Sequence, residues 1–190
     1  MEALKERILR DGENLGGGIL KVDSFINHQV DPGLMIEAGK VLAERFADCG
    51  ATKVLTAEIS GIAPALTTAL YLEVPLIYAR KTKPVTMTEP VYVEAAPSHT
   101  KGVAVFLMCS PEFLQPQDRI LIIDDFLASG QTIQALVRMV RHAGAELVGI
   151  GALIEKAFER GRQDLEPLGI PLEALAVISE MSDSKIVFAE

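Results

Sequence analysis

Basic residues are scarce in this chain of 190 residues, which has 18 Lys and Arg but 26 Asp and Glu and therefore a net charge of −8. Such an acidic average argues against a broad surface for nucleic acid or for an anionic membrane, although a small basic pocket is compatible with it. No apolar run approaches the roughly 18 residues that a membrane-spanning helix needs. Residues 1–15 are charged and lack the apolar region of a signal peptide.

Cysteine is also rare, because Cys49 and Cys109 are the only two and lie far apart in the sequence. Their separation fits no metal-binding spacing, so we interpret both as reduced, small apolar side chains. Reduced thiols and the absence of a leader predict a cytoplasmic protein. There is no internal repeat, and an apolar content of 49% is typical of a globular chain of one domain.

Short apolar runs alternate with amphipathic segments along the chain. Asp31 and Pro32 have the pattern of a helix start, and residues 131–142 predict a second long helix that ends at Gly144. The expected strands are residues 52–58, 74–80, 102–108, 118–124, 145–156, 173–181 and 185–190. This alternation predicts an α/β fold in which a mainly parallel sheet is flanked by helices.

Two parts of the chain fit the alternation less well. Residues 1–31 and 156–190 are expected to form a small hood beside a core of about 32–155, all within one domain of residues 1–190. Residues 81–101 contain three prolines and predict a long loop of the kind that is usually functional or mobile. Within it we expect a hairpin whose arms are residues 85–88 and 91–95.

The strongest functional signal is the stretch ILIIDDFLASGQT, residues 120–132. Two adjacent carboxylates, Asp124 and Asp125, are predicted to end a buried strand, at the edge of the sheet where α/β proteins bind ligands. Such acceptors suit sugar hydroxyls or hydrated Mg²⁺. A plain strand-end turn would explain an isolated acidic pair, but the residues that follow it favour a binding site.

Those following residues have the properties of a phosphate-binding loop. Small residues at Ala128, Ser129 and Gly130 allow backbone N–H groups to turn inward, and the start of the next helix adds partial positive charge. The hydroxyls of Ser129 and Thr132 can add hydrogen bonds. The stretch is neither a P-loop nor a dinucleotide-binding GxGxxG motif. The sequence therefore predicts a site for a sugar phosphate.

ILIIDDFLASGQT resembles the phosphoribosyl pyrophosphate (PRPP) motif of type I phosphoribosyltransferases. MEALKERIL, LKVDSFINHQVDP, EISGIAPA and GIGALIEKAF are similar to the bacterial subgroup of that family that uses xanthine, so the resemblance spans almost the whole chain. It implies an enzyme that transfers ribose 5-phosphate from PRPP to xanthine and releases pyrophosphate. It further implies a homodimer, and Mg²⁺ held mainly by PRPP rather than directly by protein ligands.

The resemblance also implies roles for particular residues. Asp124 and Asp125 would be the catalytic pair, which contacts the ribose hydroxyls and stabilises a cation-like C1. The residues implied for the 5-phosphate are Ala128, Ser129, Gly130, Gln131 and Thr132. The residues implied for pyrophosphate are Ser60, Gly61 and Ile62, with Arg80, Lys81 and Lys83 at the base of the loop. A plain turn and a solvated basic surface would equally explain the pyrophosphate set.

The xanthine pocket implied by the resemblance consists of Leu20, Asn27, Lys156 and Phe158. An ammonium group beside a carbonyl oxygen selects 6-oxopurines over adenine, and Phe158 can stack on a purine. A surface lysine and a core phenylalanine are the simpler interpretations. The chain differs from many relatives at Ile59, in the middle of the pyrophosphate turn, which changes packing rather than backbone donors.

Two alternatives remain open at this point. The same reaction with hypoxanthine, guanine or adenine changes only the base. A PRPP-sensing transcription regulator would keep the fold without catalysis, but it needs a DNA-binding domain or a basic face. The acidic composition and a first element at the very start of the sequence argue against a regulator.

Overall fold

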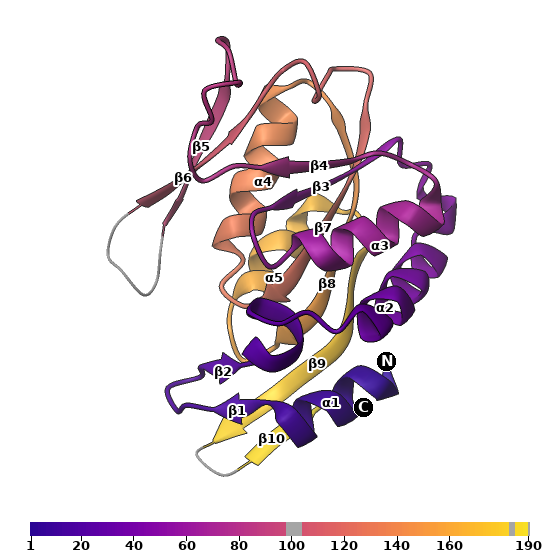
Figure 1. Cartoon of the computed structure of the whole chain (residues 1–190), viewed down its shortest axis with the longest axis vertical. Coiled ribbons are helices and arrows are strands. Elements are labelled where there is room, and N and C mark those ends of the chain that lie inside the picture. The colour runs from indigo at the N-terminus through magenta and orange to yellow at the C-terminus, as the bar shows by residue number, and fades with distance from the viewer. Residues whose placement is uncertain (98–103, 183–184, 190) are drawn as a thin grey trace.

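The computed structural model describes residues 1–97, 104–182 and 185–189. Its centre is a six-stranded sheet with the strand order β10-β9-β8-β7-β3-β4 (Figure 1). The five parallel strands are β3 (Lys53–Ala57), β4 (Leu76–Ala79), β7 (Arg119–Leu127), β8 (Glu146–Lys156) and β9 (Leu172–Ser182). Only β10 (Lys185–Phe188) pairs antiparallel, with β9. The predicted α/β fold with a mainly parallel sheet is confirmed.

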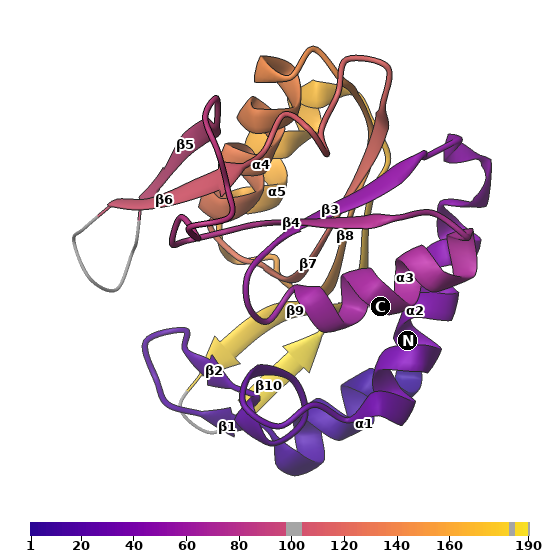
Figure 2. The ribbon, with the colours of Figure 1, turned by 45° about the horizontal axis from the view of Figure 1, so that its top comes forward.

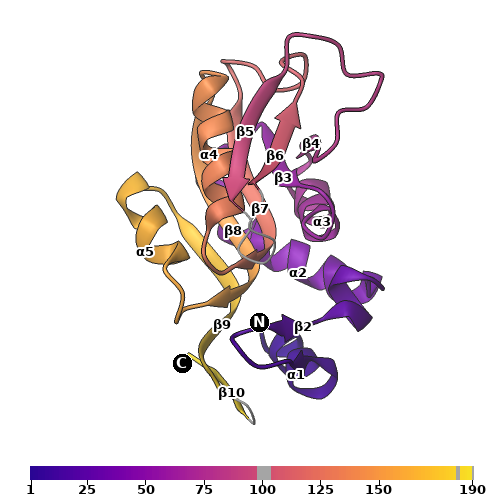
Figure 3. The same ribbon diagram turned by 90° about the vertical axis from the view of Figure 1, so that its left-hand side faces the viewer.

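Helices cover both faces of this sheet (Figure 3). α2 (Pro32–Arg45) and α3 (Ile62–Leu72) pack on one face, and α4 (Gln131–His142) packs on the other. Because side chains alternate along a strand, β7 supplies both cores: Leu121 and Ile123 join the cluster under α2 and α3, while Ile122 joins the cluster under α4. Burial on both faces explains the unbroken apolar run that precedes the acidic pair.

The predicted helix signals are confirmed. The Asp31 side chain accepts a hydrogen bond of 3.1 Å from the backbone N–H of Leu34, and Pro32 is the first residue of α2. α4 begins at Gln131, directly after Gly130, whose φ of 74° is left-handed. That conformation favours glycine, and it turns the chain from the strand into the helix.

The hairpin differs from the prediction. β5 (Tyr92–Pro97) pairs with β6 (Ala104–Cys109) in a separate two-stranded sheet, whereas the predicted arm at 85–88 lies in turns between Pro84 and Pro90. Prolines at both ends remove backbone donors that a strand needs. Residues 98–101 of the predicted loop lie outside the described residues.

The terminal segments lie side by side (Figures 1 and 2). The N-terminal part comprises α1 (Glu2–Asp11), β1 (Glu13–Asn14), β2 (Leu20–Lys21) and a π-helical turn (Asp23–Asn27). The Asn14 side chain donates to the carbonyl of Ser182, and the N-terminal amine donates to that of Leu175. The boundary predicted between core and hood at residue 155 does not coincide with an edge of the sheet. β9, which follows that boundary in the chain, pairs with β8 and extends the sheet.

In the described ranges, from residue 1 to 189 with the gaps given above, no helix has the length and apolarity needed to cross a membrane.

Candidate active site

The acidic pair does not end its strand, so that prediction is wrong. β7 continues past Asp125, and Phe126 and Leu127 still pair with Ile154 and Glu155 of β8. On its other side, β7 pairs with β3 only as far as Ile122. The long β8 extends the strand, whereas pairing with β3 stops at Ile122, although β3 itself runs on to Ala57. The acidic pair therefore lies where β7 and β3 have separated, and its side toward β3 is free for a turn.

Both carboxylates are nearly buried, with 5% of Asp124 and 8% of Asp125 exposed. The backbone N–H of Asp125 donates to Asp124 Oδ1 at 3.0 Å, and no Lys or Arg of the described chain forms an ion pair with either group. Burial, followed by the nearby Asp125 charge, raises the pKa of Asp124 well above its ordinary value, and the Lys81 charge opposes this. Such poorly compensated carboxylates suit hydroxyl donors or a cation.

The predicted phosphate loop, residues 128–132, borders the same cavity as the acidic pair. This cavity has a volume of about 230 Å³, and its lining residues are Asp124, Asp125, Phe126, Ala128, Ser129, Gly130, Gln131, Thr132 and Ile133. The first N–H groups of α4 face no partner within the helix and carry its positive dipole end. Carboxylates and an anion-binding loop thus meet at one site.

The turn at residues 58–61, between β3 and α3, brings a second predicted segment to the acidic pair. Gly61 is buried, and a Cβ atom placed on it would lie 2.6 Å from Asp124 Oδ1 and closer still to Thr56 Oγ1. Ser60 and Ile62 on either side are half-buried. The Thr56 hydroxyl is buried without a hydrogen-bond partner in the described structure. Thr56 was not predicted, although a hydroxyl in the apolar strand KVLTA is a detectable signal.

The three predicted basic residues are in different environments. Arg80 Nε lies 2.8 Å from Glu58 Oε2, and the guanidinium stands 5.7 Å from the Tyr78 ring centre. The backbone N–H of Lys81 donates to Glu58 Oε1 at 2.6 Å, while Lys83 pairs with Glu89. Of the three, Lys81 is the residue whose charge lowers the pKa of Asp124.

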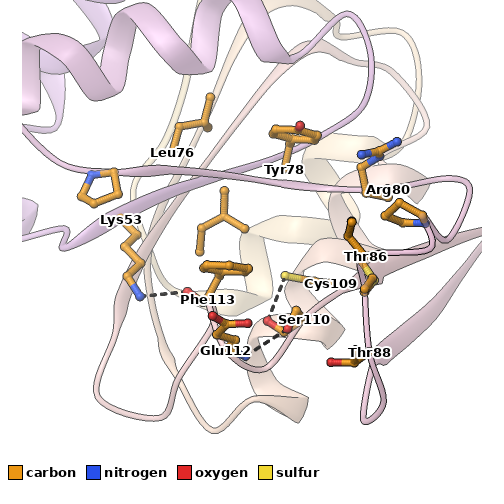
Figure 4. A pocket seen from close by; sticks show the side chains of 14 residues that line it. Lys53, Leu76, Tyr78, Arg80, Thr86, Thr88, Cys109, Ser110, Glu112 and Phe113 are labelled. Atoms are coloured by element: carbon orange, nitrogen blue, oxygen red, sulfur yellow. Dashed lines mark hydrogen bonds between the residues drawn. The ribbon is translucent and has the colours of Figure 1, made fainter.

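A larger cavity of about 450 Å³ lies away from the acidic pair (Figure 4). Its walls come from the edge strand β4, the turns near Thr86 and the segment after β6, and they include Tyr78, Arg80 and Phe113. None of its lining residues belongs to the phosphate loop. Chemistry, rather than volume, therefore locates the candidate active site.

On the predicted base side, Lys156 and Phe158 converge on Gly18. Lys156 Nζ donates to the Gly18 carbonyl at 2.7 Å, its side chain is 12% exposed, and burial lowers its pKa. The Phe158 ring, 43% exposed, would lie 3.4 Å from a Cβ atom on Gly18. Leu20 is buried in the core, and Asn27 is exposed at the end of the π-helical turn.

Three further residues lie at or behind the phosphate loop and were not predicted. Gly161 N–H donates to the Ala128 carbonyl at 2.9 Å. The neighbouring Arg162 forms a double hydrogen bond, 2.6 Å in each half, with the buried Glu155. A single carboxylate in the apolar strand GIGALIEK was the only sequence signal for this pair.

Metal binding by protein groups alone is not supported in the described part of the chain, where no three His, Cys, Asp or Glu residues cluster. Two carboxylates open to the cavity still fit a Mg²⁺ ion whose other ligands are substrate oxygens, because Mg²⁺ prefers oxygen and retains several non-protein ligands.

The fold and this site define an α/β protein with a candidate sugar-phosphate site on its mainly parallel sheet. Comparison with known families makes this specific: the chain belongs to the phosphoribosyltransferase family, since the model for the phosphoribosyl transferase domain matches residues 31–174. It is 49% identical over 188 residues to a xanthine phosphoribosyltransferase of Lactobacillus delbrueckii, covering 99% of this chain and 100% of the relative. Identity to the xanthine phosphoribosyltransferase of Deinococcus deserti is 50% over 190 residues, with 100% and 98% covered.

Solved structures agree on the fold. An adenine phosphoribosyltransferase from Rhodothermus marinus is 26% identical, with a TM-score of 0.75 over 94% of this chain and 100% of that one. The adenine phosphoribosyltransferase from Trypanosoma brucei, crystallised with AMP, pyrophosphate and ribose-5-phosphate, is 19% identical. Its TM-score is 0.76, over 95% of this chain and 82% of that one.

Proposed function

We propose that this protein transfers the 5-phosphoribosyl group of PRPP to xanthine, forming xanthosine 5′-monophosphate and pyrophosphate in purine salvage. The observation that carries the proposal is that the acidic pair and the phosphate loop line one cavity, with the Gly61 turn packed against Asp124. Identity of about half over the full length to enzymes named for xanthine supports the choice of base.

The proposed roles follow from the charges. The N–H groups of residues 128–132 hold the 5-phosphate, and the acidic pair accepts hydrogen bonds from the ribose hydroxyls. As the bond to pyrophosphate breaks, C1 becomes cation-like, and the two nearby carboxylates stabilise it. Backbone N–H groups of Ser60 and Gly61 receive the leaving pyrophosphate, with Lys81 nearby. The Ile62 N–H donates to the Ile59 carbonyl at 3.1 Å, so its predicted contact with pyrophosphate requires that bond to break. Mg²⁺, bound mainly through PRPP oxygens beside the acidic pair, would neutralise charge on the pyrophosphate.

Arg80 and Lys83 enter the proposal differently from Lys81. Their charges are engaged by Glu58 and Glu89, so contact with pyrophosphate requires them to exchange these partners when residues 81–97 close over PRPP. Such closure would also exclude water from the cation-like C1.

A homodimer and a cytoplasmic location also belong to the proposal. Leu66, Leu70 and Tyr71 on α3 and Tyr78 on the edge strand β4 are large exposed apolar side chains, as found at contact surfaces. Both cysteines are free, and burial raises the pKa of the Cys109 thiol to about 11, which fits a reducing compartment.

The test measures pyrophosphate release from PRPP with xanthine, guanine, hypoxanthine and adenine. We expect kcat/KM to be highest for xanthine and lowest for adenine, because Lys156 offers a donor where adenine also has donors. A preference for adenine, as the names of the solved relatives would suggest, contradicts the assignment of the base. Salt-sensitive DNA binding without pyrophosphate release would favour a regulator instead.

Replacing Lys156 tests the base pocket. We expect Lys156→Gln to raise KM for xanthine about 10- to 100-fold, the equivalent of a charged hydrogen bond, and to leave KM for PRPP within about twofold. Lys40→Gln is the matched control, because Lys40 also has a glutamate nearby, at 4.0 Å against 3.8 Å for Lys156, but lies on the outside of α2. Equal effects of the two changes, measured by steady-state kinetics, would remove Lys156 from the pocket.

A further inference from the structure

A buried ion pair lies directly behind the phosphate loop. Glu155, in β8, is only 1% exposed and pairs in register with Leu127, which precedes the loop. Arg162 Nε and Nη2 each donate to one of its carboxylate oxygens at 2.6 Å. Arg162 Nη1 also donates to the Leu172 carbonyl at 3.3 Å. The hydrogen bond to Glu155 raises the pKa of Arg162, so the guanidinium stays charged.

The residue before Arg162 contacts the phosphate loop through its backbone. Gly161 N–H donates to the Ala128 carbonyl at 2.9 Å. A Cβ atom on Gly161 would lie 2.9 Å from Gly130 N and closer still to the Ala128 oxygen, and a Cβ on Gly130 would lie 3.0 Å from Gly161 Cα. The two backbones are therefore packed against each other without an intervening side chain, and any shift of Gly161 moves the loop.

Residues 161–165 form a helix of five residues, α5, which is too short to be stable by its own hydrogen bonds. Its position depends on Leu165, which is buried in the core, and on the pair between Arg162 and Glu155. An arginine fork bound to both oxygens of a carboxylate fixes direction as well as distance.

We propose that Arg162, held by Glu155, is a positioning residue that sets the geometry of the 5-phosphate loop through Gly161. The inference rests on the proposed function, because it takes the sugar phosphate of PRPP as the occupant of that loop. Arg162 affects the affinity for the phosphate end of PRPP, and Lys156 affects the affinity for the purine base.

The test replaces Arg162 by Lys, which keeps the charge but cannot form the fork. We expect the Kd for ribose 5-phosphate, measured by calorimetry, and the KM for PRPP to rise about tenfold, the loss of roughly one charge-assisted hydrogen bond. KM for xanthine should stay within about twofold. Arg162→Gln, which leaves Glu155 without a counter-charge, should weaken ribose 5-phosphate binding further than Lys does; if it does not fold, Arg162→Lys decides.

Arg45→Lys is the matched control. Arg45 and Arg162 are both 35% exposed, each pairs with a glutamate, and each donates to a carbonyl of β9, at Ala174 and Leu172 respectively. Arg45 lies on α2 and should leave both constants unchanged. The inference is overturned if Arg162→Lys keeps the Kd within twofold of wild type, or if Arg45→Lys changes it equally. Wild-type binding of ribose 5-phosphate without turnover of xanthine would contradict the proposed base alone, whereas no binding at all would overturn both proposals.

Discussion

Asp124→Asn combined with Asp125→Asn is expected to lower kcat/KM for PRPP at least about 1,000-fold. Removing one group that stabilises developing charge in an enzyme typically costs about 10²–10³ in rate, and here two carboxylates beside the cation-like C1 are lost together. Asparagine keeps the size of each side chain and still accepts a hydrogen bond from a ribose hydroxyl. Rate should therefore fall far more than affinity, and pre-steady-state kinetics with PRPP and xanthine would separate the two.

Asp124→Asn alone is expected to raise stability at neutral pH. Burial raises the pKa of Asp124 in the folded protein above the unfolded value near 3.9. The folded state therefore holds this proton more tightly, so stability is fully present below about pH 3.9 and is lost as pH rises through the folded pKa. Asparagine mimics the protonated form, so the free energy of unfolding of Asp124→Asn should exceed that of wild type at pH 8 and converge with it as pH falls toward 4, as denaturant titrations would measure.

Asp118→Asn provides the opposite pattern and serves as the control. Asp118 is as buried as the acidic pair, but it forms an ion pair of 2.8 Å with Lys53 and accepts from the N–H of Gln115. Loss of the Asp118 charge should lower the free energy of unfolding and leave the KM for PRPP unchanged. If the double variant of the acidic pair retained more than a tenth of the wild-type rate, the catalytic role of Asp124 and Asp125 would be wrong.

The core of this site could be predicted from sequence because its parts are local. Residues 124–132 contain both the acceptors and the anion-binding loop, so their order in the chain fixes their spacing. The turn at Gly61 and the base residues Lys156 and Phe158 are distant in sequence, and only the family resemblance suggested them. The structure places Gly61 beside Asp124, and Lys156 and Phe158 beside Gly18.

The errors come from pairing between distant segments. The end of β7 was placed at Asp124, but the length of its partner β8 extends it by three residues to Leu127. The arm at 85–88 has β-branched residues, yet the hairpin partner of β5 is β6, the next strand along the chain. The pair of Glu155 and Arg162 went unpredicted because no local pattern links the two residues, and their contact arises only when the chain turns after β8.

Gly61→Ala is expected to lower kcat/KM for PRPP by about 100-fold and to weaken inhibition by pyrophosphate. A methyl group at this position would lie 2.6 Å from Asp124 Oδ1 and closer still to the buried Thr56 hydroxyl. Gly61 has φ −67°, a conformation that alanine adopts freely, so the effect is steric and arises from the close approach of the turn to the acidic pair. Displacement of Asp124 weakens stabilisation of the cation-like C1, and displacement of the turn weakens binding of pyrophosphate. Overpacking of this kind also costs about 1–3 kcal/mol of stability.

Gly33→Ala is the comparison that isolates this steric effect. Gly33 likewise lies at the start of a helix, and a Cβ there meets only Asp31 Oδ1, at 3.4 Å, an ordinary contact. It should leave the kinetics unchanged and stabilise the protein by about 0.4–1 kcal/mol, since alanine has less freedom than glycine in the unfolded chain. Equal pyrophosphate inhibition constants for Gly61→Ala and wild type would show that the turn does not receive the leaving group. Loss of activity without any change in pyrophosphate inhibition would then assign Gly61 to the support of Asp124 alone.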